Sequence, residues 1–265
     1  MLLPAEILRQ RCSAVCLLMS LAVFAGCSSE EIPVTRSFYH WKTEFSPCPF
    51  VREQLEECAA KVLYVRFFDV EWDAATNSPA PVGQVVFSAA PDPVFEIIPV
   101  VYVTVESLRP SDTATVPDLA LRILAQVDSL AARAGLCYRE MQLDCDWTGT
   151  TRDRFFTLAS TVRKALHARG DSLSVTIRLH QIKYPDRTGI PPADRGMLMF
   201  YNMGRMNADP GGQSIYNEAD ALKYTDFIPS YPLPLDVALP IFFWTLQLRG
   251  GRMAGIINKT NASDL

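Results

Sequence analysis

The 265-residue sequence offers little that would tie it to a metal, a nucleotide or a nucleic acid. Its histidines, His40, His167 and His180, lie far apart, and no Cys/His group has the spacing of a zinc site. No glycine-rich phosphate fingerprint follows the first strand expected below, which argues against a dinucleotide-binding sheet. The net charge is -4 without a basic cluster, so nucleic-acid binding gains no support. We therefore expect no metal site, no cofactor and no nucleic-acid partner.

The N-terminus has the order of regions that a secretory signal requires. Two arginines precede the apolar run CSAVCLLMSLAVFAG, which is too short for a comfortable membrane span. The closing FAGC resembles a bacterial lipobox, although Phe24 stands where Leu is usual. We expect residues 1–26 to be a lipoprotein signal peptide, Cys27 to carry the lipid anchor, and residues 27–36 to form a polar tether. An ordinary cleaved signal is the alternative. The lipoprotein interpretation predicts a protein of the bacterial cell envelope, anchored to the membrane on its periplasmic or outer surface.

Four further cysteines would then lie in an oxidising compartment: Cys48, Cys58, Cys137 and Cys145. A bridge between Cys48 and Cys58 is possible, but their spacing only suggests it.

Apolar runs alternate with amphipathic segments over residues 37–265, which we expect to form one domain. The periodicity and the terminal glycines predict helices, and these are expected at 50–60, 116–135, 151–170 and 214–228. Runs of β-branched and aromatic residues predict seven strands, at 37–45, 61–72, 96–107, 141–148, 172–184, 196–204 and 234–244. Apolar residues make up 49% of the chain, enough for one large core.

Strands interleaved with helices predict a parallel α/β fold. Near-continuous apolar runs indicate strands that are covered on both faces. Polar residues gather at the carboxyl ends of many strands, which favours a (β/α)8 TIM-type barrel over a doubly wound sheet. The strand count is one short, and the residues after Trp244 could hold part of an eighth strand (AGIIN, 254–258) but not its two helices. We therefore expect an open barrel or a C-terminally truncated one, and favour truncation.

One segment, MQLDCDWTGTTRDR at 141–154, places two carboxylates two residues apart at the end of a strand. With a period of two, Gln142, Asp144, Asp146 and Thr148 point to one side, and the intervening Leu, Cys and Trp point to the other. The two Asp side chains would emerge about 7 Å apart.

In a barrel lumen, burial and mutual repulsion would raise the pKa of one of these two carboxyl groups. A proton shared between Asp144 and Asp146 would suit acid–base work on sugars. The alternative is that Asp144 is a satisfied core acid and that Asp146 caps the helix starting at Thr151. The residues alone leave both interpretations open.

The stretch LDCDWT resembles the fourth-strand motif D-x-x-D-x-D-x-E of the chitinase-like glycoside hydrolases (family 18). Its last three acids would fall on Asp144, Asp146 and position 148. MFYN at 199–202 resembles the sixth-strand motif M-x-Y-D/N of that family, and LPLDVALPIFFW resembles its seventh-strand apolar run. Counted from residue 37, the three segments are the fourth, sixth and seventh strands, which is the order of the family. The resemblance implies a glycoside-hydrolase-like barrel with an oligosaccharide partner.

The chain departs from the family at the centre of the mechanism. In the family the final Glu protonates the leaving oxygen, while the preceding Asp orients a substrate N-acetyl group that acts as nucleophile. The resemblance gives the orienting role to Asp146 and the holding of that group to Tyr201 and Asn202. Position 148 is Thr, whose hydroxyl cannot serve as an acid near neutral pH. Losing a general acid removes on the order of 10²–10⁴ in rate.

Two hypotheses follow from the Thr at position 148. In the first, another strand-end acid takes over, and the candidates are Asp69, Glu71 and Glu106. In the second, the site binds sugar without cleaving it, through aromatic stacking surfaces. These aromatic candidates are Trp72, Trp147, Tyr201 and Trp244, with packing against a helix as the alternative for Trp147.

Arg178 and His180 share one face of the expected fifth strand. A buried His paired with a strand-end Asp is as compatible with a structural role as with a catalytic one. Arg195, in PPADRG, is expected in a loop over the site mouth.

Three functions remain open on the sequence. The chain could cleave a glycosidic bond with Asp146 oriented by Asp144, capture glycans without cleaving them, or act as a scaffold for another envelope protein. The Thr at position 148 and the short C-terminus favour binding over catalysis. So many strand-end acids are unusual for a pure scaffold.

Overall fold

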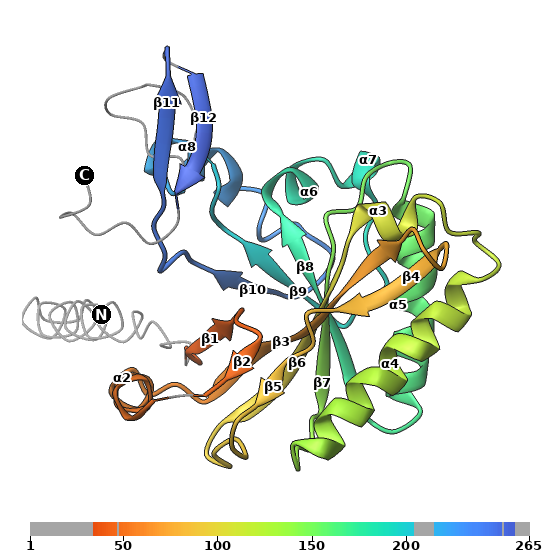
Figure 1. Cartoon of the computed structure of the whole chain (residues 1–265). Coiled ribbons are helices and arrows are strands. Elements are labelled where there is room, and N and C mark those ends of the chain that lie inside the picture. The colour runs from red at the N-terminus through yellow and green to blue at the C-terminus, as the bar shows by residue number, and fades with distance from the viewer. Residues whose placement is uncertain (1–33, 47, 204–214, 251, 258–265) are drawn as a thin grey trace, which may run out of the picture. The chain divides into compact units, whose positions relative to one another are not determined.

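The computed structural model describes residues 34–46, 48–203, 215–250 and 252–257 (Figure 1). Contacts divide the chain into two units, Met1–Thr35 and Arg36–Leu265, and every helix and strand given below belongs to the second. The expected signal peptide and Cys27 lie outside the described residues, as does most of the tether. In the described part of the chain, no helix combines the length and the apolar character needed to cross a membrane.

The second unit is built on a curled sheet of seven parallel strands, joined in the order β1-β3-β6-β7-β8-β9-β10 (Figure 1). The strands are Ser37–His40 (β1), Val62–Asp73 (β3), Glu96–Val103 (β6), Glu140–Asp144 (β7), Ser172–Arg178 (β8), Arg195–Met199 (β9) and Leu235–Ala238 (β10). Each strand pairs with the next along the chain, and the order never reverses as it does in a doubly wound sheet. Among the described residues β10 does not pair with β1, so the sheet is an open, TIM-like barrel. The predicted α/β barrel class with seven clear strands is confirmed.

The helices cover the outer face of this sheet or extend the loops at its edges. They are Pro49–Glu57 (α2), Val105–Leu108 (α3), Val116–Arg133 (α4), Arg152–His167 (α5), Leu179–Lys183 (α6), Pro185–Thr188 (α7) and Glu218–Thr225 (α8). The longest, α4, has Pro117 and Asp118 in its first turn, and Gly135 follows its end with φ +67°. These residues suit a helix start and a helix stop, which is why the predicted boundaries hold.

Three short pairs complete the unit. Strand β4 (Ser78–Val82) folds back on β3, β5 (Val86–Phe87) pairs with β2 (Glu44–Phe45), and β11 (Thr245–Arg249) pairs with β12 (Arg252–Ile257). Of these pairs, β3–β4 and β11–β12 are antiparallel and β2–β5 is parallel. The expected eighth strand at 254–258 is therefore wrong over its described residues, which belong to the antiparallel β11–β12 hairpin.

Several predicted strands end earlier than their sequences suggested. The strand predicted at 172–184 stops at Arg178, because the Arg178 N–H donates to Gln181 Oε1 (2.7 Å) and opens α6. The strand predicted at 96–107 stops at Val103, because the Thr104 side chain accepts from the Ser107 N–H (3.2 Å) and caps α3. In both cases a local side-chain hydrogen bond competes with continuation of the sheet.

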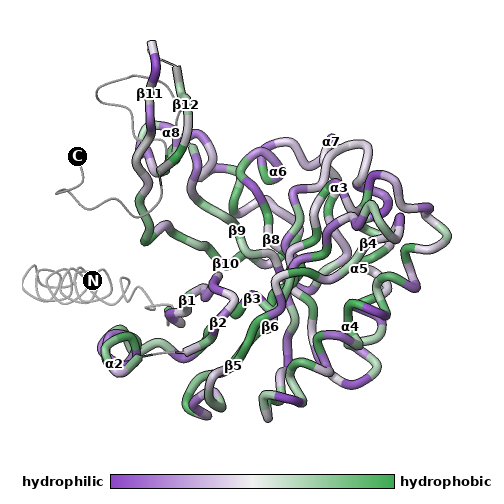
Figure 2. The backbone as a smooth tube through the Cα atoms, viewed as in Figure 1, coloured by the Kyte–Doolittle hydropathy of each residue, from purple (hydrophilic) through white to green (hydrophobic). Residues whose placement is uncertain are grey.

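The two faces of the sheet have different cores. The larger one lies between the strands and the helices and includes Leu143, Cys145 and Trp147. The smaller one lies on the opposite face of the strands, in the lumen, and consists of Tyr64, Ile98, Val100, Met197 and Met199. In Figure 2 the central strands are mostly hydrophobic, while α4 alternates along its length as a half-buried helix does.

The Cys48–Cys58 bridge that the spacing left possible is absent from the structure, in which both thiols are free. The two cysteines flank the nine-residue helix α2, whose rise separates them by about 15 Å. A disulfide needs Cα atoms closer than about 7 Å, so bridging would require α2 to unwind.

Candidate functional site

The carboxyl ends of β7 and β8 place three charged side chains together. Asp144 ends β7 and Arg178 ends β8, with Asp146 two residues beyond β7. Arg178 Nη2 donates to Asp144 Oδ1 (3.0 Å), and its Nε donates to Asp146 Oδ1. Thr176, one layer below on β8, donates its hydroxyl to the same Asp144 oxygen (2.6 Å). One guanidinium therefore bridges both carboxylates of the motif, and we name Asp144, Asp146 and Arg178 the carboxylate clamp.

Burial sets the electrostatics of the carboxylate clamp. Asp144 is 4% exposed, and burial raises the pKa of its carboxyl group even though Arg178 and Thr176 act in the opposite direction. Burial disfavours the Arg178 cation, but Asp144 and Asp146 outweigh this and raise the pKa of the guanidinium. The side chain of Asp146 is 51% exposed, so the clamp runs from the core to the surface.

Three uncharged side chains form a hydrogen-bonded chain across the lumen face of the strands, which we name the lumen floor. Tyr39 donates its hydroxyl to Gln142 Oε1 (2.6 Å), and Gln142 Nε2 donates to Ser174 Oγ (3.1 Å). The Tyr39 ring stacks on Tyr64 and on Trp41, with centroids 4.9 and 5.3 Å apart. Burial first, and then Tyr64 and the acid above, raise the pKa of Tyr39, which keeps its proton for this bond.

A cavity of about 440 Å³ opens beside the clamp. It is lined by Asp146, Arg178, Leu179, His180, Met199, Tyr201, Asn202, Met203 and Tyr224. Asn202 has φ +57° and donates its N–H to the Ile215 carbonyl (2.6 Å), a left-handed conformation that residues other than glycine adopt uncommonly. Strained backbone of this kind is enriched at ligand sites. We name this space the clamp cavity.

Aromatic rings continue from the clamp cavity toward the end of the chain. The Tyr201 ring meets Phe242 edge-on at 5.6 Å, and Phe242 lies 5.6 Å from Trp244. Phe242 is 43% exposed, so part of this aromatic row faces solvent. A row of partly exposed rings is a surface on which sugar faces can stack.

Six of the predicted site residues meet around the clamp: Asp144, Asp146, Arg178, His180, Tyr201 and Asn202. Trp244 joins them through the aromatic row. His180 does so from a different element than predicted, because it lies on α6 and not on β8.

The other predicted residues lie elsewhere. Asp69 is held by Arg66 of the same strand through Nε (2.6 Å) and Nη2, and Asp69 is close enough to Asp144 to raise its pKa slightly. Glu71 and Trp72 sit opposite Ala80 and Pro79 in the β3–β4 hairpin.

Two further predicted positions differ from expectation. Glu106 is exposed in the first turn of α3. Trp147 is 3% exposed and stacks on Phe155 of α5 at 5.0 Å, which is the helix-packing alternative.

Arg195 does not lie in a loop over the mouth, and that prediction is wrong. It is the first residue of β9, at the amino end of the sheet. Its guanidinium binds Glu140 (2.7 Å) and Asp236 (2.9 Å), and donates to the Tyr64 hydroxyl (3.1 Å). We name Arg195, Glu140 and Asp236 the amino-end cluster.

Thr148 belongs to the start of α5. Its N–H donates to Thr151 Oγ1 (3.0 Å), its hydroxyl lies 3.0 Å from that of Thr150, and its carbonyl accepts from the Arg152 N–H (2.8 Å). Asp146 binds Arg178 and does not cap α5, so the capping alternative is wrong. Asp144 is a buried acid with two hydrogen-bond donors, as the other half of that alternative required.

Sequence reasoning missed three residues of this site. Thr176 lies two positions before Arg178 and shares its face, so the period of the strand could have revealed it. Tyr102, near the end of β6, has its pKa raised to about 12 by burial and then by Asp146 and Asp144. Trp41 extends the rings over the lumen, but it lies outside β1 and no strand pattern marks it.

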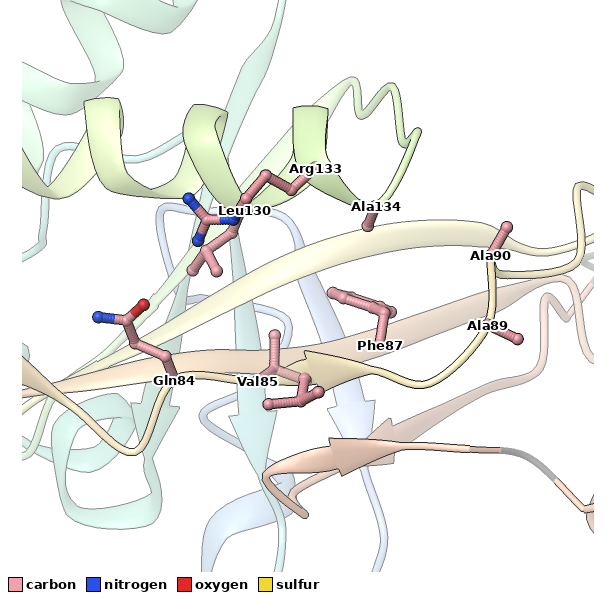
Figure 3. Close-up of a pocket in the computed structure, with 9 residues that line it drawn as sticks. Gln84, Val85, Phe87, Ala89, Ala90, Leu130, Arg133 and Ala134 are labelled. Atoms are coloured by element: carbon pink, nitrogen blue, oxygen red, sulfur yellow. The ribbon is translucent and has the colours of Figure 1, made fainter.

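Two other observations concern what the site lacks and where it does not lie. No group of three or more His, Cys, Asp or Glu with the arrangement of a metal site occurs within the described ranges. A cavity of about 450 Å³ between the β5 segment and the end of α4 is lined by Phe87, Leu130 and Arg133 among others (Figure 3). It contains no carboxylate and no residue from a carboxyl end of the parallel strands, so we do not regard it as the site.

No family model matches the sequence, and no curated protein does. Solved structures do match the fold. A chitinase from Chromobacterium violaceum superposes with a TM-score of 0.50 at 14% identity, over 85% of this chain and 74% of that one. Catalytic domain 2 of the group II chitinase of Ostrinia furnacalis, a mutant in complex with penta-N-acetylchitooctaose, gives a TM-score of 0.51 at 13% identity, over 86% of this chain and 70% of that one. At such identities the likeness shows the fold alone, an α/β barrel of the kind that these chitinases have.

Proposed function

We propose that the protein binds oligosaccharides at the clamp cavity without hydrolysing them. The fold is shared with chitinases, one of which was solved with a chitooligosaccharide. The clamp cavity offers hydrogen-bonding side chains, and the aromatic row beside it offers stacking surfaces. Polar groups beside exposed rings are the usual composition of a sugar site.

The observation that carries this proposal is the bridging of both motif carboxylates by Arg178. Hydrolysis requires a carboxyl group that delivers a proton to the leaving oxygen. A guanidinium that binds two carboxylates stabilises their ionised forms and so opposes such delivery. The resemblance would place the acid at position 148, where a Thr hydroxyl instead takes part in the start of α5.

One observation favours hydrolysis as a second candidate function. Burial raises the pKa of Asp144, and a carboxyl group with a raised pKa is the kind that enzymes use as an acid. In this candidate Asp144 holds the proton and Asp146 orients the substrate. Its burial below Asp146 places Asp144 away from a ligand in the clamp cavity, which is why binding is preferred.

Binding and turnover can be measured on the same oligosaccharides. We expect chitooligosaccharides to bind in calorimetry, with no release of reducing ends over a day of incubation. Tyr201→Ala should weaken binding about tenfold or more, as loss of a stacked ring does. Tyr231→Phe is the matched control, because Tyr231 is an aromatic residue that does not line the clamp cavity. Release of reducing ends that Asp144→Asn abolishes would replace the proposal by hydrolysis, and absence of any binding would leave only the scaffold function.

We further propose that the protein is a lipid-anchored protein of the bacterial envelope. The support is the order of basic, apolar and small residues before Cys27. A Cys27→Ser variant should leave the membrane fraction for the soluble fraction after cell lysis. Unchanged fractionation, with no lipid on Cys27 by mass spectrometry, would contradict the anchor.

A further inference from the structure

A larger cavity, of about 600 Å³, adjoins the clamp cavity and shares His180 with it. We name it the side cavity. The loop that starts α5 and the helices α6 and α7 supply its lining, which consists of Trp147, Thr148, Gly149, His180, Tyr184, Arg187 and Thr188. Its volume is in the range of small-molecule sites, and a ligand in the clamp cavity can extend into it past His180.

One wall of the side cavity is fixed and aromatic. Trp147 stacks on Phe155, and its Nε1 donates to the Thr188 carbonyl at 3.0 Å. This bond ties the segment before α5 to α7, so the indole is held in place before any ligand arrives. Trp147 is itself only 3% exposed, so it supports the wall from behind, while Tyr184, which is 46% exposed, is the ring of this cavity that a sugar can reach.

The formal charge among the residues that line the side cavity is the positive one of Arg187. His180 and Arg187 contribute the ionisable nitrogen groups, and no Asp or Glu lines it. The Arg187 guanidinium lies 5.7 Å from the centroid of the Tyr184 ring, and within the described ranges it makes no ion pair. Its neighbour Asp186 is exposed and does not line the cavity.

Asp146 does not cancel this charge. Asp146 is close enough to affect His180, but Arg178 binds its carboxylate. Burial lowers the pKa of His180, Arg178 and Arg187 lower it further, and Asp146 opposes them. Arg187 is exposed and makes no ion pair within the described ranges, so its N–H donors are available to a ligand.

We infer that the side cavity binds a carboxylate-bearing sugar, with Arg187 donating to the carboxylate and the exposed Tyr184 ring beside the sugar. The inference rests on the proposed glycan binding and names its substrate class, an acidic amino-sugar chain in place of a neutral one. Thr148 presents a hydroxyl to this cavity, where a carboxylate would repel such a group.

The test uses two ligands that differ only in charge. The first is the disaccharide of N-acetylglucosamine and N-acetylmuramic acid, and the second is the same disaccharide with its lactyl carboxylate converted to the amide. Calorimetry with the full mature protein should show the acid binding about tenfold more tightly than the amide at low salt, the value of one charge-assisted hydrogen-bond pair. Raising the salt concentration should narrow the difference, because Arg187 is exposed.

Two variants locate the preference. Arg187→Gln should bind acid and amide equally, and Thr148→Glu should weaken the acid more than the amide. Arg122→Gln, which removes the same charge from an exposed position on the outer helix α4, should keep the tenfold preference.

The failure of this inference differs from the failure of glycan binding. Equal binding of acid and amide by the unmodified protein, or a preference that survives Arg187→Gln, overturns the inference and leaves the proposed function standing. Binding of neither ligand, nor of chitooligosaccharides, overturns both.

Discussion

The two ends of the barrel lumen use the same chemistry for different purposes. At each end one arginine bridges two acids: Arg195 at the amino end, and Arg178 at the carboxyl end. The amino-end cluster joins three strands, because Glu140, Arg195 and Asp236 come from β7, β9 and β10. The carboxylate clamp joins only two, and it borders a cavity.

This difference shows that the role of an ion pair depends on where in the fold it lies. An arginine that ties separate strands holds the sheet in register, and its removal costs stability alone. An arginine between a buried acid and a cavity both supports the fold and presents donors to a ligand. The composition of the two clusters does not distinguish them; the elements they connect do.

The largest expected effect is at Arg178. We expect Arg178→Met to lower the free energy of unfolding by about 3–5 kcal/mol, because it leaves the buried Asp144 carboxylate without its cation. Urea denaturation at neutral pH measures the change. Glycan binding should be lost in the same variant, while Arg178→Lys should recover part of the stability.

The pH dependence of that loss has a definite sign. The pKa of Asp144 is raised in the folded protein, so its contribution to stability is greatest below the ordinary Asp value and is lost as the pH rises through the raised one. Without Arg178 the pKa rises further, so the deficit of Arg178→Met should shrink as the solution is acidified. A deficit that is constant with pH would show that Asp144 is not the cause.

A smaller effect is expected at the amino-end cluster. Arg195→Met should lower the free energy of unfolding by about 2 kcal/mol, less than a fully buried pair because solvent screens a partly exposed one. The side chains of Arg195 and Asp236 are 36% and 46% exposed. Glycan affinity should be unchanged, as calorimetry on the folded variant would show. If Arg195→Met lost as much glycan affinity as Arg178→Met, the amino-end cluster would not be purely structural as we expect.

The smallest effect concerns Asp194, also at the start of β9. Burial opposes its ionisation, but donors from Arg163, the Leu173 N–H and His167 outweigh burial and lower its pKa. Its stabilisation is therefore present above the ordinary Asp pKa and is lost as the pH falls through the lowered value. Asp194→Asn should lower the free energy of unfolding by about 1 kcal/mol at neutral pH. The difference from the unmodified protein should vanish in strong acid; a difference that persists there would point to packing.

The sequence predicted the strands and the lumen face of β7 well, because alternation with a period of two depends only on local geometry. Gln142 and Asp144 face the lumen, while Leu143 and Cys145 pack against helices. Strand ends were less predictable. The side-chain bond that starts α6 moved His180 from a strand onto a helix, and no periodicity reports such a competition.

The partners of each charge were not predictable either. Pairing Arg178 with Asp144 requires the position of β8 beside β7, which the sequence does not give. For the same reason Arg195 was placed over the mouth, whereas it begins a strand at the far end. The sequence pattern therefore predicted the fold and the two acids of the clamp. That Arg178 neutralises these acids could be learned only from the three-dimensional structure.

The lumen floor has a consequence for how the protein can diversify. Its hydrogen bonds connect three strands through Tyr39, Gln142 and Ser174, and they form without a bound ligand. Substitutions in the segments that carry Thr148 and Arg187 can then change ligand specificity without weakening the hydrogen bonds that hold the strands together.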